Sequence, residues 1–277
     1  MISRPQLIEQ IKQKRSFLCV GLDSDIGKIP EFLKQYADPI FEFNKRIIDA
    51  TKDLCVSYKP NAAFYESRGI KGLQSLIATW QYLPKNCLNI IDAKRGDIGN
   101  TSDMYARAFF NETDSGMSFD AITLSPYMGN DSVTPYLVYR DKWVVLLALT
   151  SSDGSKDFQY LTTEDGLLYE AVIKKANTWA NSDRIMFVVG ATKSTEFINI
   201  RKYAPDNFLL VPGVGAQGGS LADVCHYGMT KDCGLIVNAS RSIIYASNGK
   251  DFAEAARAEA LSIQKQMEVE LEKAGII

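Results

Sequence analysis

Histidine is nearly absent from this sequence, and several other features are missing with it. The 277 residues include one histidine, His226, which argues against a serine–histidine–aspartate triad and against a zinc site built from several histidines. Lysine and arginine number 31 against 33 acidic residues, so the net charge of −2 gives no electrostatic reason to expect nucleic acid or an anionic membrane as a partner. No apolar run approaches about 18 residues, so we expect no membrane span.

The cysteines are few and unpatterned. There are five, an odd number, and no two have the Cys-x-x-Cys spacing of redox or zinc motifs. We therefore expect buried, reduced thiols in a cytoplasmic protein. The first 16 residues are amphipathic and lack the apolar core of a signal peptide. His226 falls near the end of a predicted helix, where we expect it to have no catalytic role.

Short apolar runs alternate with amphipathic stretches along the whole chain. The eight candidate strands are 17–23, 55–60, 87–94, 119–126, 143–150, 184–190, 207–213 and 234–240. Helical periodicity occurs around 38–53, 62–80, 100–111, 130–140, 163–180, 194–203, 219–229 and 251–274. This alternation predicts a parallel sheet, and eight such units predict an α/β fold of the TIM, or (β/α)8, barrel type. We expect one domain over residues 1–277, with the barrel at about 16–245 and helical extensions at both ends.

The barrel prediction indicates where to look for function, because active sites of this fold lie at the carboxyl ends of the strands. Polar residues do stand at the predicted strand ends: Asp23, Lys59, Asp92, Lys94, Ser125, Thr150 and Ser151. The longest polar connection, residues 151–166 after the fifth strand, is either a lid over this site or an ordinary surface loop.

The segment "DAKRGDIGNTS", residues 92–102, concentrates charge at the end of a core strand. Asp92 and Lys94 are two residues apart and so share a face of the strand, and Lys59 can reach the same space from the neighbouring strand. With Asp97 in the following turn, these residues form an alternating set whose charges survive burial by pairing. A lysine beside carboxylates stays protonated, which makes Lys94 a candidate proton donor. The alternative is an ion-pair network that only closes the barrel top.

Two later segments indicate a phosphate site. "PGVGAQGG", residues 212–219, offers backbone N–H groups and leads into a predicted helix, whose N-terminus can face an anion. Arg241 follows the eighth strand and can bind phosphate with two hydrogen bonds. Loops after strands seven and eight are the usual phosphate site of this fold. The residues alone thus predict a phosphorylated small molecule and acid–base chemistry without an evident cofactor, but they do not name the reaction.

The same residues resemble the orotidine 5′-phosphate decarboxylase family, in its longer bacterial-type form. "DAKRGDIGNT" fits the pattern D-x-K-x-x-D-I-x-x-T at each fixed position. The segments "VGLD", "YKPNAAFYE", "PGVGAQGG" and "ASRSI" are similar to its first-strand aspartate, second-strand lysine, phosphate loop and eighth-strand arginine. The matches run in order from about residue 17 to 245.

The resemblance implies decarboxylation of orotidine 5′-phosphate to uridine 5′-phosphate and CO2, without metal or cofactor, in a homodimer. By that match Lys94 protonates C6 of the pyrimidine, and Asp92 crowds the leaving carboxylate. The other implied roles are ribose binding by Lys59 and Asp23; contribution of Asp97, Ile98 and Thr101 to the neighbouring subunit's site; base recognition by Ser151; and a phosphate site with Pro212, Gln217, Gly218, Ser240 and Arg241. The segment "TSSDGS" lacks the proline common there in the family, and Ser152 is the alternative to Ser151.

Two other functions remain open. One is a metal-dependent sugar-phosphate decarboxylase or synthase of the same superfamily, which shares the D-x-K-x-x-D element. The other is a barrel that binds a phosphorylated ligand without turnover. The charged set that includes Lys94 argues against a pure binding protein, because binding alone does not require a proton donor.

Overall fold

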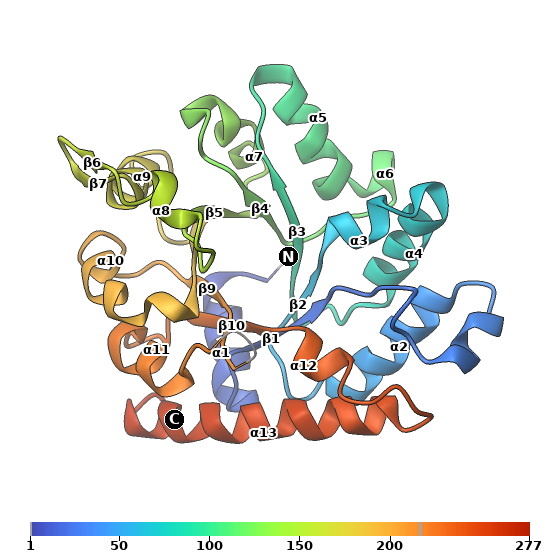
Figure 1. Cartoon of the computed structure of the whole chain (residues 1–277). Coiled ribbons are helices and arrows are strands. Elements are labelled where there is room, and N and C mark those ends of the chain that lie inside the picture. Colours follow the sequence, from blue (N-terminus) through green and yellow to red (C-terminus); the bar gives the residue numbers. More distant parts are fainter. Residues whose placement is uncertain (1, 216–217) are drawn as a thin grey trace.

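The computed structural model describes residues 2–215 and 218–277. Eight parallel strands close into a barrel in the order β1-β10-β9-β8-β5-β4-β3-β2, which confirms the predicted fold (Figure 1). The strands are β1 Leu18–Leu22, β2 Ser57–Pro60, β3 Leu88–Arg95, β4 Ala121–Leu124, β5 Trp143–Leu149, β8 Ile185–Val189, β9 Leu209–Pro212 and β10 Leu235–Ala239. All eight expected strands are present, because each apolar run is buried between the barrel interior and the surrounding helices.

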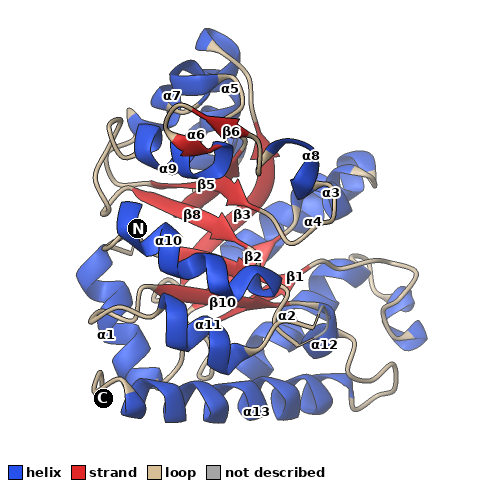
Figure 2. Ribbon diagram, turned by 60° about the vertical axis from the view of Figure 1, so that its left-hand side comes forward, coloured by secondary structure: helices blue, strands red, loops and turns tan. Residues whose placement is uncertain are grey.

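Helices surround the strands on all sides (Figure 2). The longer ones are α1 Arg4–Lys14, α2 Pro39–Thr51, α4 Gly69–Tyr82, α5 Gly99–Phe110, α9 Leu168–Ala176, α10 Phe197–Tyr203, α11 Leu221–Gly228 and α13 Phe252–Lys273. Short helices are α3 Ala62–Glu66, α6 Glu112–Ser115, α7 Thr134–Leu137, α8 Ser155–Phe158 and α12 Arg241–Ile244. Short 3-10 helices cover Glu31–Gln35, Gly129–Ser132 and Ala191–Glu196.

Three expected helices differ from the structure, each at a local break. The helix expected at 62–80 is split into α3 and α4, because the chain turns at Gly69, whose φ of +62° favours glycine. The segment 130–140 forms only a 3-10 turn and α7. The segment 163–180 begins with a small antiparallel hairpin, β6 Thr162–Thr163 and β7 Gly166–Leu167, before α9 starts. Residues 151–166 therefore contain α8 and all of this hairpin except Leu167.

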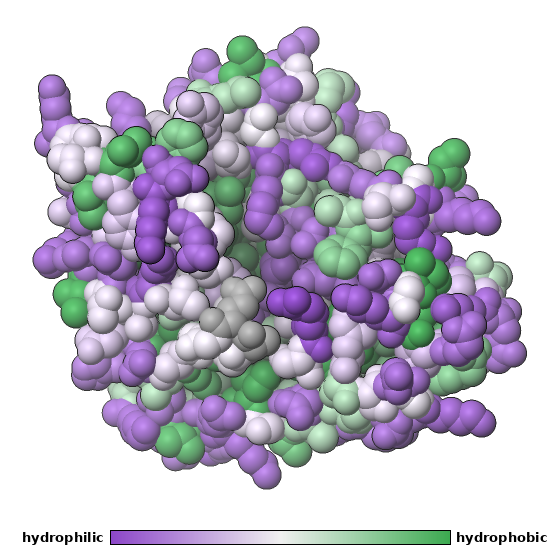
Figure 3. Space-filling view, viewed as in Figure 1, coloured by the Kyte–Doolittle hydropathy of each residue, from purple (hydrophilic) through white to green (hydrophobic). Residues whose placement is uncertain are grey.

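Helix α1 lies across the amino end of the barrel. The indole N–H of Trp143, the first residue of β5, donates to the carbonyl oxygen of Ile2 at 3.0 Å. Arg4 donates to Ser182 O at 3.3 Å and pairs with Asp232 at 3.2 Å, and both partners precede strands. The amino end of the barrel is therefore covered, and the carboxyl end is the face seen in Figure 3, which is hollowed near its centre. In the described part of the chain no helix is both long and apolar enough to cross a bilayer.

Candidate active site

The side chain of Asp92 on β3 is the centre of the polar cluster at the carboxyl end of the barrel. Its Oδ2 lies 2.9 Å from Nζ of Lys59 on β2, and its Oδ1 lies 2.6 Å from Nζ of Lys94. The side chains of Lys59 and Asp92 are 5% and 10% exposed, whereas that of Lys94 is 51% exposed. The cluster thus holds one lysine in the barrel interior and presents the other at the opening.

Burial and charge pairing oppose one another at this cluster. Burial alone would raise the pKa of Asp92, but the ammonium groups of Lys59 and Lys94 outweigh it and hold the pKa well below its usual range. Burial would likewise lower the pKa of Lys59, yet the carboxylates of Asp92 and Asp23 raise it. Asp92 and Lys59 are therefore both charged at neutral pH.

Of the four charged residues predicted to form one cluster, three meet within this chain, and Asp97 does not join them. Asp97 follows β3 and has no ion pair with any described lysine; its Oδ1 accepts the backbone N–H of Ile98 at 2.8 Å. Ile98 is 52% exposed, and Thr101, in the first turn of α5, is also exposed. The structure therefore does not bring Asp97, Ile98 or Thr101 to the Asp92 cluster of their own chain.

The backbone at Lys94 is not extended, although the two-residue spacing of Asp92 and Lys94 predicted a regular strand there. Ile91 pairs with Ile122 and Arg95 with Leu124, so residues 92–94 lie opposite the single residue Thr123 of β4. This is a β-bulge, and Lys94 has a φ of +47°, in the left-handed region. Asp92 and Lys94 do meet, as expected, but through the bulge rather than through regular alternation.

A cavity of about 160 Å³ adjoins the cluster on the side of β9 and β10. Its lining residues come from five strands or the loops that follow them: Asp23, Lys59, Asp92, Pro212, Gly213, Val214, Asn238, Ala239, Ser240, Arg241 and Ser242. Oδ1 of Asp23 and Oδ1 of Asn238 are buried and have no hydrogen-bond partner among the described residues. Buried polar atoms are normally paired, so these two oxygens are available to a polar ligand in the cavity.

The predicted phosphate loop is partly folded on itself. The Gly218 N–H donates to Gly215 O at 2.8 Å, and the Gly219 N–H donates to Gly213 O at 3.2 Å. Gln217 lies outside the described residues. Ser240 and Arg241 stand where β10 passes into α12, and the Arg241 side chain is exposed at the cavity. The structure thus brings Pro212, Ser240 and Arg241 to the cavity, whereas the N–H group of Gly218 has a partner within the loop.

Ser151 lies after β5, on the rim beside β8, and does not line the cavity. A Cβ atom added to Gly190 would come within 2.6 Å of the Ser151 backbone nitrogen, so these two chain segments touch. The Ser152 hydroxyl lies 3.0 Å from Oγ1 of Thr150. The two serines therefore occupy different surroundings.

Two residues of the site were not predicted from the sequence. Thr123, inside β4, donates a hydrogen bond to Oδ1 of Asp92. The residue predicted for this strand was Ser125, two positions further along the chain. Asn238 lies inside β10 and lines the cavity. Both are polar residues within otherwise apolar strands, at positions that share a face with a predicted site residue two places along, and this alternation was the available signal.

Most of the chain matches a known protein family. A sequence model described as "Orotidine 5'-phosphate decarboxylase / HUMPS family" matches residues 16–257. The chain belongs to this family. Its D-x-K-x-x-D segment and its barrel both fall within the matched range.

Several relatives in the orotidine 5′-phosphate decarboxylase family match over nearly the full chain. The protein of that name from Flavobacterium johnsoniae is 58% identical over 265 residues, which are 95% of this chain and 96% of that protein. The one from Parabacteroides distasonis is 56% identical and covers 100% of this chain and 99% of that protein. The solved structure of Leishmania donovani UMP synthase has a TM-score of 0.80 at 38% identity, over 94% of this chain and 56% of that longer chain.

Proposed function

We propose that this protein converts orotidine 5′-phosphate to uridine 5′-phosphate and CO2 in the synthesis of UMP. The observation that carries the proposal is the Asp92 carboxylate, which is held between Lys59 and Lys94 at the opening of the barrel. Family membership supports the choice of substrate, because the near full-length relatives bear the name of this activity.

The cavity beside the cluster suits the non-reacting parts of the substrate. We assign the phosphate to Arg241, with Ser240, Pro212, Gly218 and Gln217 around it. The guanidinium group can donate two parallel hydrogen bonds to phosphate oxygens. For the N–H of Gly218 to contribute, its bond to Gly215 must open when phosphate binds. We assign the ribose hydroxyls to Lys59 and Asp23 and recognition of the pyrimidine to Ser151, after movement of its loop.

The chemical step needs an acid at C6 of the pyrimidine. When the bond between C6 and the carboxylate breaks, CO2 leaves and the electron pair stays on C6. The ammonium group of Lys94, half exposed at the opening, donates a proton to that carbon. Asp92 repels a substrate carboxylate beside it, and this repulsion weakens as neutral CO2 forms. The free-energy difference between the bound substrate and the transition state is therefore smaller. These steps require no cofactor.

We also propose a cytoplasmic homodimer in which each subunit completes the other's site. Asp97, Ile98 and Thr101 stand together at the start of α5, away from their own cavity. Ile98 and Met104, at the start of α5 and within it, are exposed apolar residues, at 52% and 51%. Such a patch is typical of an interface. In the dimer Asp97 would supply the second carboxylate that the cluster lacks within one chain.

The test of the reaction is the consumption of orotidine 5′-phosphate, followed by ultraviolet absorbance in excess EDTA. We expect the wild type to turn over and Lys94→Ala to lose about 100- to 10,000-fold in kcat, as removal of a general acid does. Lys71→Ala, on the exposed face of α4, is the matched control. A folded wild type without turnover in EDTA would refute the proposal; activity only with sugar phosphates and Mg²⁺ would support the metal-dependent alternative.

The shared site has a separate test. Neither Asp97→Ala nor Lys94→Ala should be active alone, but unfolding and refolding them together should restore about a quarter of wild-type activity, because half of randomly formed dimers are mixed and each has one intact site. Absence of any recovery in a mixture shown to contain mixed dimers would contradict the assignment of Asp97 to the partner's site.

A further inference from the structure

The hydroxyl group of Thr123 makes three hydrogen bonds at the β3 bulge. Its Oγ1 accepts the backbone N–H of Ala93 and that of Lys94, each at 3.0 Å, and donates to Oδ1 of Asp92 at 2.9 Å. A threonine hydroxyl has one donor and two acceptor sites, so its capacity is fully used. All three bonds go to residues 92–94, the segment that carries the predicted chemistry.

These bonds replace the regular ladder where the strands are out of register. Because residues 92–94 face one residue of β4, their N–H groups cannot all pair with backbone carbonyls of that strand. Thr123 is 1% exposed as a whole residue, so water does not supply the missing acceptor. Without the hydroxyl, two N–H groups would lose their partner in the segment where Lys94 holds a left-handed backbone. Such a conformation is strained for a residue other than glycine and persists only when its surroundings fix it.

We propose that Thr123 is a positioning residue for the decarboxylation, acting through Lys94 and Asp92. By accepting the Lys94 N–H it holds the backbone that aims the ammonium group. By donating to Oδ1 of Asp92 it orients the same oxygen that Lys94 contacts at 2.6 Å. This inference rests on the proposed function. Its consequence is specific: loss of the hydroxyl should slow the chemical step, while the phosphate side of the cavity stays intact.

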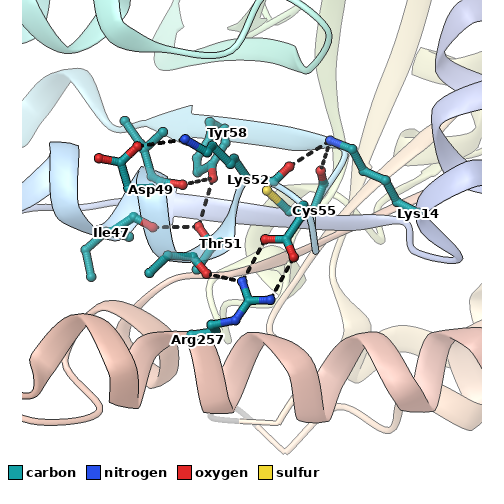
Figure 4. Close-up of polar contacts among 11 residues, drawn as sticks. Lys14, Ile47, Asp49, Thr51, Lys52, Cys55, Tyr58 and Arg257 are labelled. Carbon is teal, nitrogen blue, oxygen red and sulfur yellow. Dashed lines mark hydrogen bonds and ion pairs between the residues drawn. The ribbon is translucent and has the colours of Figure 1, made fainter.

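A purely structural threonine is available for comparison at the other end of the barrel. Thr51, at the end of α2, is 0% exposed and bonds Ile47 O and the Tyr58 hydroxyl, each at 2.8 Å (Figure 4). Thr51→Val thus removes a buried hydroxyl that has two hydrogen-bond partners. Thr123→Val removes a buried hydroxyl that has three. Both substitutions should destabilise the fold, but only one should change kcat.

The experiment compares Thr123→Val, Thr123→Ser and Thr51→Val with the wild type. Valine keeps the shape of threonine without the hydroxyl, and serine keeps the hydroxyl. We expect Thr123→Val to lose about 10- to 100-fold in kcat, as loss of a hydrogen bond to a charged group implies, with KM changed by less than about threefold. Thr123→Ser should retain most of kcat. Thr51→Val should keep wild-type kcat at a lower melting temperature.

A folded Thr123→Val with wild-type kcat would overturn the proposal, and so would an equal loss in Thr123→Ser. If Thr123→Val does not fold, Thr123→Ser decides: near wild-type kcat supports the role, and a loss like that expected for valine refutes it. Crystal structures of the wild type and Thr123→Val provide a readout independent of turnover. A Lys94 φ that stays near +47° without the hydroxyl would contradict the positioning role, even if the substrate assignment itself proved wrong.

Discussion

The two ends of strands β2 and β3 both hold lysine ammonium groups, but in different ways. At the amino end, Nζ of Lys14 donates to Lys52 O at 2.9 Å and Cys55 O at 2.8 Å (Figure 4). It also contacts Sγ of Cys87 at 3.4 Å. Its three protons have three acceptors, so the group is satisfied. At the carboxyl end, two ammonium groups converge on one carboxylate, and the side chain of Lys94 is half exposed beside a cavity.

This difference separates a closed end of the barrel from an open one. At the amino end, the ammonium group of Lys14 donates to backbone carbonyls just after α2, and helix α1 covers this end. The carboxyl end has a strained backbone at Lys94, and one oxygen each of Asp23 and Asn238 has no hydrogen-bond partner in the part of the chain that the structure describes. Strain and unpaired polar atoms are tolerated where a ligand uses them. Substitutions of matched residues should therefore affect turnover at one end and stability at the other.

The largest contrast should come from two paired aspartates. Asp92→Ala leaves the buried ammonium group of Lys59 without its partner, and we expect a loss of about 3–5 kcal/mol in stability, together with loss of turnover. Asp53→Ala breaks the exposed pair with Arg257, whose two bonds are 2.7 Å each, and should cost less than about 1 kcal/mol. Urea denaturation and a turnover assay measure both. Equal effects of the two substitutions would remove the distinction between the ends.

A smaller contrast should come from the two arginines. Arg241→Ala removes the proposed phosphate contact, so kcat/KM for orotidine 5′-phosphate should fall by about 10- to 100-fold. Arg257→Ala, at the amino end, should leave kcat/KM unchanged. Addition of free guanidinium, which replaces the missing side chain, provides a control, because only a defect at the phosphate site should respond. An Arg241→Ala enzyme with normal kcat/KM would place the phosphate elsewhere.

The smallest expected effect is a pH dependence at the amino end. A hydrogen bond from the Cys55 thiol, opposed by burial and aided by the ammonium group of Lys14, lowers the pKa of Cys87 to about 7. Since this folded-state pKa is depressed, the stabilisation is complete above the thiol's ordinary value and is lost as the pH falls through about 7. The stability difference between wild type and Cys87→Ser should grow by about 1–2 kcal/mol from pH 7 to 9.

Cys225→Ser is the control for this measurement, because burial raises the pKa of the Cys225 thiol. Its stability difference from wild type should not grow over the same pH range and should shrink slightly near pH 9, where the thiol of the unfolded chain begins to ionise. A Cys87→Ser difference that stays flat from pH 7 to 9 would show that the Cys87 thiol is not ionised at the closed end.

The sequence was sufficient for the barrel and for most of the charged cluster. The apolar runs are long enough and regular enough to predict each strand, and the strand-end rule then places Lys59, Asp92 and Lys94 together. All five cysteines are buried free thiols, as expected. His226 lies in the last turn of α11 with an exposed side chain. These features follow from local patterns and one topological rule.

The remaining features depend on contacts between strands, which local patterns do not contain. The bulge at residues 92–94 arises from the register of β3 against β4, and the role of Thr123 follows from that register. The break at Gly69 needs a left-handed turn that helical periodicity does not reveal. The cluster prediction also included Asp97, although the chain turns into α5 before its side chain can join the others.

The left-handed backbone of Lys94 has a consequence for laboratory evolution of this protein. Glycine and asparagine accept such a backbone more readily than lysine does. A library selected only for thermal stability should therefore admit them at position 94, whereas a library selected for turnover should retain lysine. The residue recovered at this one position would report which of the two pressures had acted.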